Sequence, residues 1–307
     1  MGLGKQQPDS EPVLTPDGWK AIGSLAPGDL VIGSSGHAAR VLAVYPQGMK
    51  GVYRVDMSDG SWTRAGAEHL WYVRTPTERW RDRPGRVMTT KELIGAGLRD
   101  NFGNKKWFIP LVEPVVMPAQ KLPVEPYLLG VILGDGHVKA HGAVSITTDA
   151  EILAAWGGRI AGHKSAGIAT LHMSTPELRA GMKTLGLAGK RSWEKHVPGA
   201  YLVGDIAQRL AVLQGLLDTD GSPIAAGGVE FCSTAYPLVE AVVELVESLG
   251  GSARLKAGRF TTYQGGLGRE SWRVNVKMPD GAAPFRLRRK LAKWVPPTKC
   301  PPTRAIV

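Results

Sequence analysis

Two short apolar runs, each ending in Asp-Gly, dominate the hydrophobic pattern of the chain. The first occupies residues 128–136 and the second residues 213–221. Each run is too short to span a membrane and too uniformly apolar for a surface helix, so both are predicted to form helices buried on most sides. Their acids, Asp135 and Asp220, stand 85 positions apart, which leaves room for one small αβ unit per run. The repeat predicts two similar units on one chain.

Residues 13–73 alternate short apolar stretches with turn residues. Residues 52–57 alternate apolar and polar side chains, and Ser-Asp-Gly-Ser at 58–61 is typical of a hairpin turn. Pro-Asp-Gly at 16–18 and Pro-Gly-Asp at 27–29 are further turn signals. The pattern predicts a small all-β unit.

Residues 122–294 run twice through the same order of motif helix, strands and a longer helix. The expected strands are 143–148, 168–174, 229–234, 252–256 and 271–277, and the expected helices between them are 149–156, 175–185 and 236–249. The polar positions of the last two strands carry Arg, Lys and Asn. A sheet with one apolar face and one such face suits a DNA groove, because these side chains reach base edges and phosphates. A merely solvated face would more often mix both signs of charge.

The charge balance narrows the class of partner. The 307 residues carry a formal net charge of +11 with an isoelectric point near 9.7, which favours a polyanion, and nucleic acid over a membrane. No apolar run approaches the roughly 20 residues of a spanning helix, and the polar residues 1–12 are unlike a signal peptide. The two cysteines form no zinc-ligand pair. We expect a soluble, cytoplasmic protein that binds no membrane.

A basic segment joins the two regions. Within residues 74–106, nine Lys or Arg stand against four Asp or Glu. The stretch 79–86, Arg-Trp-Arg-Asp-Arg-Pro-Gly-Arg, is interrupted by Pro and Gly, so we expect a loop along phosphates rather than one helix. A solvated loop is the plainer alternative. Thr-x-x-Glu at 89–92 predicts a capped short helix.

The twin Asp-Gly motifs suggest metal chemistry. Each acid is expected at the C-terminal end of its helix, where free carbonyls and the negative end of the helix dipole converge, so that a carboxylate there makes a cation site. Few hard oxygen ligands open to water suit Mg²⁺. Small residues four apart in each run, Gly130 and Gly134, then Gly215 and Thr219, would let the helices touch and bring the acids together. Such a pair fits metal-assisted phosphodiester hydrolysis, one acid per DNA strand.

A structural interpretation competes with this one, because an Asp-Gly after an apolar helix is a common cap. Two copies at domain-like spacing in a basic chain favour the metal site. The pattern resembles that of the LAGLIDADG homing endonucleases with both motifs on one chain. The resemblance implies an αββαββα tandem repeat over residues 122–297, with repeats at about 122–204 and 205–297. It also implies a monomer that cuts double-stranded DNA to leave 3′ overhangs.

By the same resemblance, Asp135 and Asp220 are the metal-binding acids, with Gly134 and Thr219 beside them in the metal site. The implied cofactor is Mg²⁺ or Mn²⁺. Ca²⁺ would be expected to bind without supporting cleavage. Both acids are also assigned a catalytic role.

The family uses one lysine per half to stabilise charge near the scissile phosphate or to help activate water. Lys195, within Lys-His-Val-Pro, matches the family element that precedes the second motif. In the second half, the resemblance favours Lys293 over Lys290 as the catalytic lysine and leaves Lys290 as a phosphate contact. Asp218 has Leu133 at its place in the first run, so we expect it to cap or pack rather than to bind metal.

The side chains expected to contact DNA are basic or polar residues of the basic segment, of the loop after the first motif and of the second-half strands. They are Arg79, Arg81, Arg83, Arg86, His137, Lys139, Arg254, Lys256, Arg259, Arg273, Asn275, Lys277 and Lys290.

The N-terminal region resembles the first part of an intein's Hint domain, because its turns are followed by Glu-His-Leu-Trp at 68–71. It departs from that pattern where splicing chemistry would sit. A common intein begins with Cys or Ser about seven residues before the first strand, where this chain has Gln6 and Gln7. Gly66 replaces the Thr of the Thr-x-x-His motif, although His69 is kept. The terminal His and Asn of an intein are also missing from this sequence.

The expected fold class is therefore α+β. An all-β Hint-like domain at 1–121, with a DNA-recognition segment at 74–118, precedes the repeat at 122–297 and a tail at 298–307. The predicted function is site-specific cleavage of double-stranded DNA. Two alternatives stay open: a self-splicing intein whose C-terminal half is absent, and a LAGLIDADG protein that binds DNA without cutting it.

Overall fold

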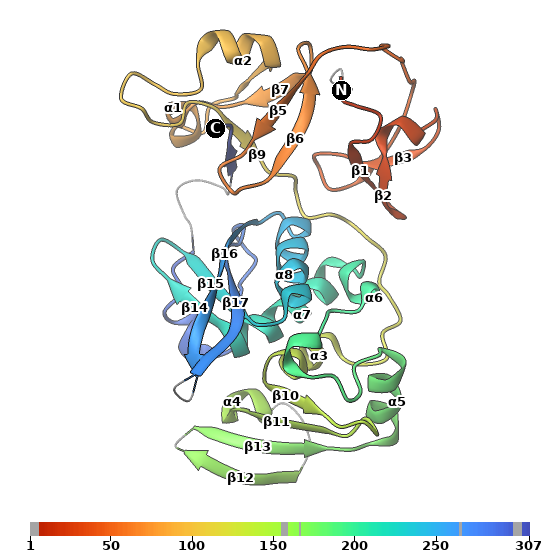
Figure 1. Ribbon diagram of the computed structural model, residues 1–307, viewed down its shortest axis with the longest axis vertical. Coiled ribbons are helices and arrows are strands. Elements are labelled where there is room, and N and C mark those ends of the chain that lie inside the picture. Colours follow the sequence, from red (N-terminus) through yellow and green to blue (C-terminus); the bar gives the residue numbers. More distant parts are fainter. Residues whose placement is uncertain (1–5, 155–158, 166, 264–265, 297–302) are drawn as a thin grey trace. The chain divides into compact units, whose positions relative to one another are not determined.

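The structure, a computed structural model, describes residues 6–154, 159–165, 167–263, 266–296 and 303–307. The chain forms two compact units (Figure 1). One comprises Met1–Val116 and Thr298–Val307, and the other comprises Met117–Pro297. Each unit has its own cluster of buried apolar side chains. No helix in the described part of the chain is long and apolar enough to cross a bilayer.

The first unit is built mainly from antiparallel strand pairs. Over its described residues these pairs are β1 (Pro12–Thr15) with β2 (Gly18–Ala21), β3 (Leu30–Ile32) with β4 (Ala38–Arg40), β5 (Val52–Asp56) with β6 (Trp62–Gly66), β7 (Leu70–Val73) with β8 (Arg86–Thr89), and β9 (Phe108–Pro110) with β18 (Thr303–Ala305). A short 3-10 helix lies at Ile22–Ser24. The unit also contains two short helices: α1 (Pro76–Trp80), which was not expected, and α2 (Thr90–Ala96), which was.

The end of the chain contributes to the core of the first unit. Strand β18 pairs with β9, and the next residue, Ile306, is buried with Trp71, Val73 and Trp107. The sequence analysis treated residues 298–307 as a tail. The pairing partner of 303–305 lies almost 200 positions earlier in the chain, so no local pattern could announce it.

Both short helices of the first unit begin with a capping box. Thr89 and Glu92 cap α2 reciprocally, as the Thr-x-x-Glu pattern predicted. Thr75 and Glu78 do the same for α1, with a proline in its first turn. Residues 79 and 80, the start of the stretch 79–86 that was expected to be a loop, therefore belong to helix α1. It ends at a turn in which Asp82 has a positive φ of 45°.

The second unit contains two successions of similar elements. The first comprises α3 (Pro126–Asp135), β10 (Gly136–Val138), β11 (Val144–Asp149), α4 (Ala150–Leu153), β12 (Arg159–Ser165), β13 (Ile168–Met173) and α5 (Pro176–Thr184). A 3-10 helix, Ser192–Glu194, and α6 (Gly199–Leu202) follow. The second succession comprises α7 (Ile206–Asp220), β14 (Gly221–Ile224), β15 (Gly228–Ser233), α8 (Tyr236–Ser248), β16 (Ser252–Tyr263), β17 (Gly266–Lys277) and α9 (Arg288–Leu291).

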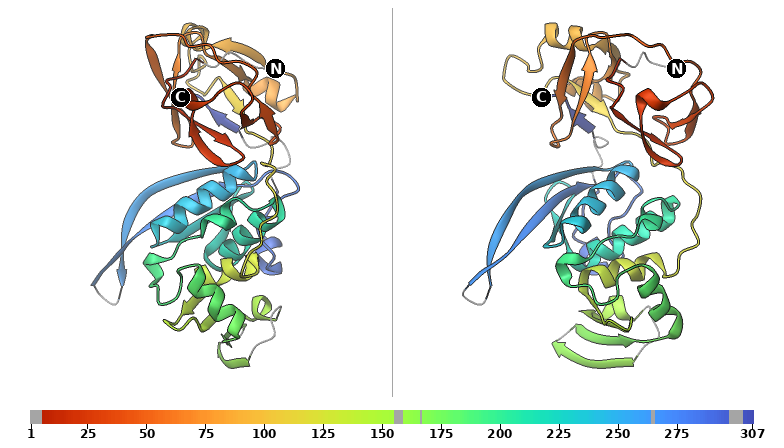
Figure 2. Two further views of the ribbon diagram at one scale, coloured as in Figure 1. Left: turned by 90° about the vertical axis from the view of Figure 1, so that its right-hand side faces the viewer. Right: turned by 45° about the vertical axis from the view of Figure 1, so that its right-hand side comes forward.

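The two sheets of this unit have matching strand orders, β10-β11-β13-β12 and β14-β15-β17-β16. Figure 2 shows how far the β16–β17 hairpin extends. The mixture of helices and small antiparallel sheets agrees with the expected class at this coarse level. The short strands β10 and β14 and the length of this hairpin were not predicted, because their sequences lack a long alternating pattern. The two final residues of the helix expected at 149–156 lie outside the described residues.

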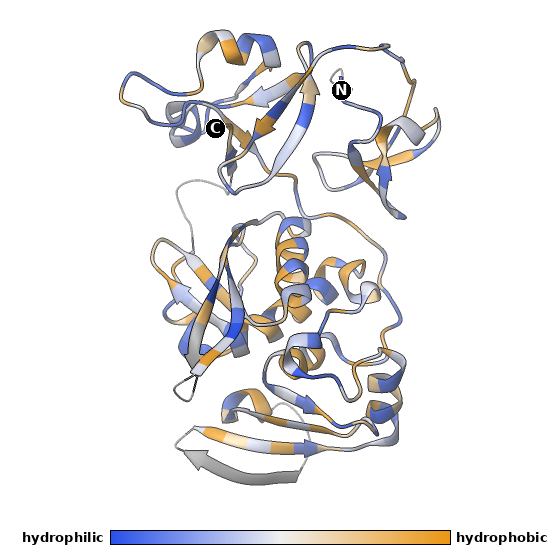
Figure 3. Cartoon of the chain, viewed as in Figure 1, coloured by the Kyte–Doolittle hydropathy of each residue, from blue (hydrophilic) through white to orange (hydrophobic). Residues whose placement is uncertain are grey.

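The core of the second unit is formed around α3 and α7. Both helices bury most of their residues, as their uniform apolarity predicted, and Figure 3 shows apolar residues along α3 and α8. The helices cross where each has a glycine. A Cβ added at Gly130 would collide with the carbonyl oxygen of Val212, and one added at Gly215 would collide with that of Tyr127. Only glycine permits this backbone contact.

We expect Gly215→Ala to lower the free energy of unfolding by about 1–3 kcal/mol, because the added methyl group must push two helix backbones apart. Gly199→Ala is the matched control, since a Cβ there meets nothing within 4 Å, and it should change that free energy by less than about 0.5 kcal/mol. Urea denaturation followed by tryptophan fluorescence measures both. Equal effects of the two substitutions would contradict the close helix contact.

Candidate active site

The structure brings the two motif acids together. Asp135 is the last residue of α3 and Asp220 is the last residue of α7. Gly134 makes room for the second helix end, because Asp220 Oδ2 lies 3.2 Å from where a Cβ of Gly134 would be. Burial, together with the negative charge of Asp135, raises the pKa of Asp220 to about 6. Burial also raises the pKa of Asp135.

Lys195 lies directly beneath the first acid. The residue is only 6% exposed. The Nζ donates to four backbone carbonyls at the end of α3, those of Ile132 (3.1 Å), Leu133 (2.9 Å), Gly134 (3.2 Å) and Gly136 (2.7 Å). This lysine therefore caps the helix and neutralises the negative end of its dipole. Burial lowers its pKa to about 8, against the opposing influence of Asp220 and Asp135.

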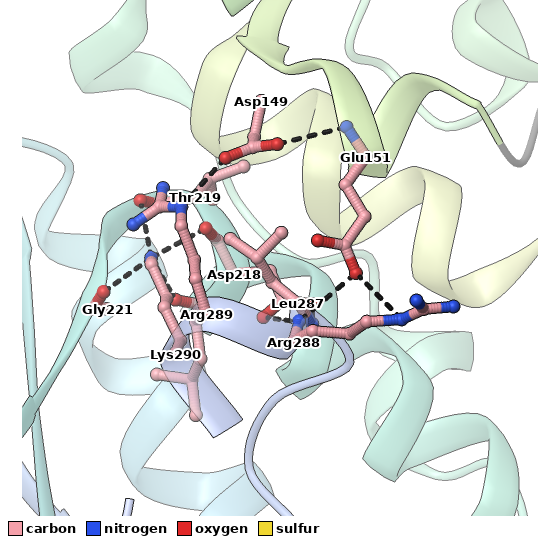
Figure 4. Close-up of polar contacts among 10 residues, drawn as sticks. Asp149, Glu151, Asp218, Thr219, Gly221, Leu287, Arg288, Arg289 and Lys290 are labelled. Carbon is pink, nitrogen blue, oxygen red and sulfur yellow. Dashed lines mark hydrogen bonds and ion pairs between the residues drawn. The ribbon is translucent and has the colours of Figure 1, made fainter. Parts of the chain in front are cut away.

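Lys290 has the equivalent place under α7. Its Nζ donates to the carbonyls of Leu217 (3.0 Å), Asp218 (2.6 Å), Thr219 (3.2 Å) and Gly221 (2.6 Å). Each of these acceptors stands 85 positions after one of the acceptors of Lys195. Figure 4 shows Lys290 directed at this helix end. It is also 6% exposed, and burial lowers its pKa.

Lys290, rather than Lys293, which the resemblance favoured, is the lysine that lies at this helix end. Lys293 lies beyond α9 and is exposed, whereas Lys290 is no surface phosphate contact. The physical reason is the placement of buried residues before the helix. Phe285 and Leu287 are anchored in the core, so the inward face of the following turn is taken by the residue three positions after Leu287.

The residues at the helix ends fit an open site for a hard cation. No cluster of three or more His, Cys, Asp or Glu side chains exists among the described residues, so a closed protein cage is ruled out there. Mg²⁺ takes one or two carboxylates and completes its shell with water and phosphate oxygens, which the Asp135–Asp220 pair can satisfy. Gly134 and Thr219 stand beside the pair. Of the four carbonyl oxygens that accept from each lysine, theirs lie farthest from the Nζ atom, at 3.2 Å.

The second sheet carries the strand residues expected to contact DNA, and it adds an unexpected acid. Glu230 on β15 accepts from Lys256 Nζ at 2.9 Å and lies 3.6 Å from Arg273. Asn275 is opposite both Glu230 and Arg254 in the strand register. Glu230 therefore holds two of the predicted DNA contacts in place. The other three cations expected on this sheet, exposed and outside the Glu230 pairings, are Arg254, Arg259 and Lys277.

The first sheet presents a different face. His137 and Lys139 are exposed on and after β10, as expected of residues that could meet DNA. Thr147 and Thr170 are hydrogen-bonded across neighbouring strands at 2.8 Å. Ser145 stands opposite His137. On β10, β11 and β13, the strands of this sheet whose side chains the structure describes, these positions carry hydroxyl and imidazole groups.

The basic segment in the first unit is only partly free. The guanidinium of Arg79 stacks on the Phe108 ring at 4.2 Å from its centroid, and Arg86 forms an ion pair with Glu78. Arg81 and Arg83 are exposed. The composition of the segment could not distinguish Arg79 and Arg86, which make internal contacts, from Arg81 and Arg83, which are exposed. Internal stacking and ion pairing depend on the path of the chain after α1.

A second polar cluster surrounds His69 in the first unit. The backbone N–H of Gln6 donates to His69 Nδ1 at 3.2 Å, and the carbonyl of Gln6 accepts from Gly66 N at 2.7 Å. The Gln6 side chain accepts from Glu68 N. His69 is buried, with its ring centroid 4.5 Å from that of Trp71. The histidine thus holds the amide of the residue found where an intein has its first nucleophile.

Comparisons with known proteins give one curated relative and several solved structures. No family profile matches the chain. It is 33% identical over 267 residues to the replicative DNA helicase DnaB of Mycobacterium intracellulare, a match that covers 81% of this chain and 43% of the helicase. The chain therefore spans less than half the length of that relative.

The similar solved structures overlap only weakly with this one. The Msm DnaB1 intein splicing domain bound with zinc is 31% identical, over 28% of this chain and 62% of that one, at a TM-score of 0.24. The gp41-1 intein is 27% identical, over 34% and 74%, at 0.25. The homing endonuclease I-DmoI in complex with DNA and Ca is 14% identical, over 55% and 86%, at 0.35. Such low TM-scores do not establish a shared fold.

We expect Asp220→Asn to stabilise the metal-free protein above about pH 6. The pKa of the carboxyl rises from 3.8 to about 6 on folding, so its ionised form costs on the order of 2–3 kcal/mol at neutral pH. Because the folded-state pKa is the higher one, this cost disappears as the pH falls from about 6 to below 4. Thermal unfolding in a chelator at pH 8 and pH 4 measures it.

Asp205→Asn is the control for this measurement. Asp205 caps the other end of α7 through its bond to Gln208 N, so the same substitution there relieves no carboxylate repulsion. Unfolding midpoints of wild type and Asp220→Asn that coincide at pH 8 would contradict the raised pKa of the Asp220 carboxyl.

Proposed function

We propose that this chain is a site-specific double-stranded DNA endonuclease of the LAGLIDADG type, carried with a Hint-like splicing unit. The observation that carries the proposal is the carboxylate pair Asp135 and Asp220 at the adjoining ends of two packed helices, each with a buried lysine beneath it. A paired site of this kind suits hydrolysis of one phosphodiester bond on each DNA strand.

A bound Mg²⁺ or Mn²⁺ would supply charge stabilisation at the phosphate and an activated water. The two carboxylates would hold it. Lys195 and Lys290 keep positive charge within the cluster and so offset the cost of two buried carboxylates. Their hydrogen bonds to the helix carbonyls also hold the helix ends in place, which fixes the direction of each acid.

The sheets of the second unit would contact the DNA target, with both half-sites read by one chain acting as a monomer in the cytoplasm. Arg254, Arg259 and Lys277 are exposed and suited to phosphates. Lys256 and Arg273 are oriented by Glu230 and suited to base edges. As the resemblance to the LAGLIDADG family implies, cleavage of both strands would leave staggered ends with 3′ overhangs.

A second candidate function is protein splicing, favoured by the contact between the Gln6 amide and His69 Nδ1. A histidine in this position can assist cleavage of the peptide bond before residue 6. Gln6 offers no hydroxyl or thiol, so that residue cannot itself take up an acyl group. We therefore propose that the second unit cleaves DNA. The first unit would keep only the contact that holds the backbone at Gln6 against His69. Binding of DNA without cleavage is the third possibility.

We expect Asp220→Asn to abolish cleavage and to spare DNA binding. The amide keeps the shape of the side chain but removes the charge that a divalent cation needs. A library of random duplexes incubated with Mg²⁺, Mn²⁺ or Ca²⁺ and sequenced at new ends would reveal the target and the cation requirement. Wild-type cleavage of that target by Asp220→Asn would refute the assignment.

The splicing candidate has its own test. With a reporter domain fused before residue 1, we expect no release of the reporter by thiols, because Gln6 forms no thioester. Release that is thiol-dependent and lost in His69→Ala would favour splicing instead. Gel electrophoresis and mass spectrometry of the released fragment identify the cleaved bond.

A further inference from the structure

A short segment carries Lys290 to the end of α7. We call Phe285–Leu291 the lysine segment. Its first two apolar residues, Phe285 and Leu287, are almost completely buried. Its cations Arg288 and Arg289 are paired with Glu151 and Asp149 of the first half, as Figure 4 shows. The position of Lys290 therefore depends on what holds this segment against α7.

Asp218 is the group that holds it. Its side chain lies on α7, two residues before Asp220, and the residue is 2% exposed. The carboxylate accepts the backbone N–H of Arg286 at 3.0 Å and that of Leu287 at 3.2 Å. It also accepts the hydroxyl of Tyr127 at 2.8 Å. Two consecutive backbone amides of the lysine segment thus donate hydrogen bonds to one buried carboxylate.

The side chain of Arg286 completes the arrangement. Its Nε donates to Gln214 Oε1 at 2.7 Å, and its guanidinium lies 4.2 Å from the centroid of the Tyr127 ring. Gln214 in turn donates to the carbonyl of Ala283 at 2.9 Å. The start of the segment is therefore tied both to α7 and, through Tyr127, to α3. A positive guanidinium near Asp218 also compensates its buried charge.

The first half has no counterpart of this carboxylate. Leu133 stands 85 positions before Asp218 and is buried in the apolar core. Lys195 nevertheless reaches its four carbonyls, from a segment anchored by the buried Val197. Equivalent lysines are thus positioned by unlike means, and only the second depends on a buried carboxyl side chain.

We propose that Asp218 is a positioning residue for Lys290, which fixes the lysine segment and so seats the ammonium group beneath the end of α7. This inference rests on the proposed function where it concerns cleavage, because Lys290 donates to the end of α7, which carries Asp220, whereas Lys195 donates to the end of α3, which carries Asp135. Loss of Asp218 should then impair one catalytic half more than the other.

The first test needs no nuclease activity. Acetylation of the full-length protein with acetic anhydride, read by mass spectrometry, reports the accessibility of each lysine amine. In wild type, Lys195 and Lys290 should be labelled at least about tenfold more slowly than the exposed Lys277. In Asp218→Asn, labelling of Lys290 should rise by about tenfold, while Lys195 stays protected. The control Asp205→Asn should leave both protected.

Two outcomes would overturn the proposal. One is a Lys290 that stays as protected in Asp218→Asn as in wild type. The other is a joint rise of Lys195 and Lys290, which would indicate general loosening. If Asp218→Asn does not fold, Tyr127→Phe removes only the hydroxyl donor and keeps the ring under Arg286. It should raise labelling of Lys290 alone, and either of the same two outcomes in this variant would count against the proposal.

The second test measures each strand separately on a duplex with differently labelled ends. Asp218→Asn should slow cleavage of one strand by about tenfold or more relative to the other, and Lys290→Met should slow the same strand. The double variant should be no slower than Lys290→Met, since both changes act through one amine. Equal slowing of both strands, or additive effects, would refute the positioning role. A wild-type protein that cuts no duplex would instead refute the proposed function and leave the labelling result standing.

Discussion

The close contact between α3 and α7 is the constraint on which the second unit depends. Glycines at positions 130 and 215 let the two backbones meet without intervening side chains. The helix ends then converge, and two carboxylates are forced into one partly dehydrated region. Their raised pKa values are a direct result of this packing. Packing and chemistry are thus joined at the same pair of helices.

Two buried lysines make this arrangement tolerable. A helix end presents unpaired carbonyls, and a neighbouring carboxylate adds further negative charge. Each ammonium group satisfies the carbonyls, because it donates to four of them, and it offsets the negative charge, because it stands close to the acids. Removing one lysine would leave buried acceptors unpaired as well as a charge unbalanced, which is more costly than losing an exposed ion pair.

The halves of the second unit share an order of elements but not a chemistry. The described side chains on β10, β11 and β13 include Ser, Thr and His, whereas the second sheet carries Arg, Lys and Asn organised by Glu230. The lysine on the second side depends on Asp218, and that on the first side does not.

The sequence by itself determined the repeat, the two acids and the buried character of both motif helices, because apolar runs and a terminal Asp-Gly are local patterns. It also indicated Lys195, which lies in a recognisable element. Tertiary structure decided between Lys290 and Lys293, since that choice depends on how Phe285 and Leu287 are buried. Tertiary structure also determined the partners of Asp218 and Glu230. It showed that Arg79 and Arg86 make internal contacts, and that residues 303–307 belong to the first unit. In each case the deciding contact joins segments far apart in the chain, and no local pattern encodes it.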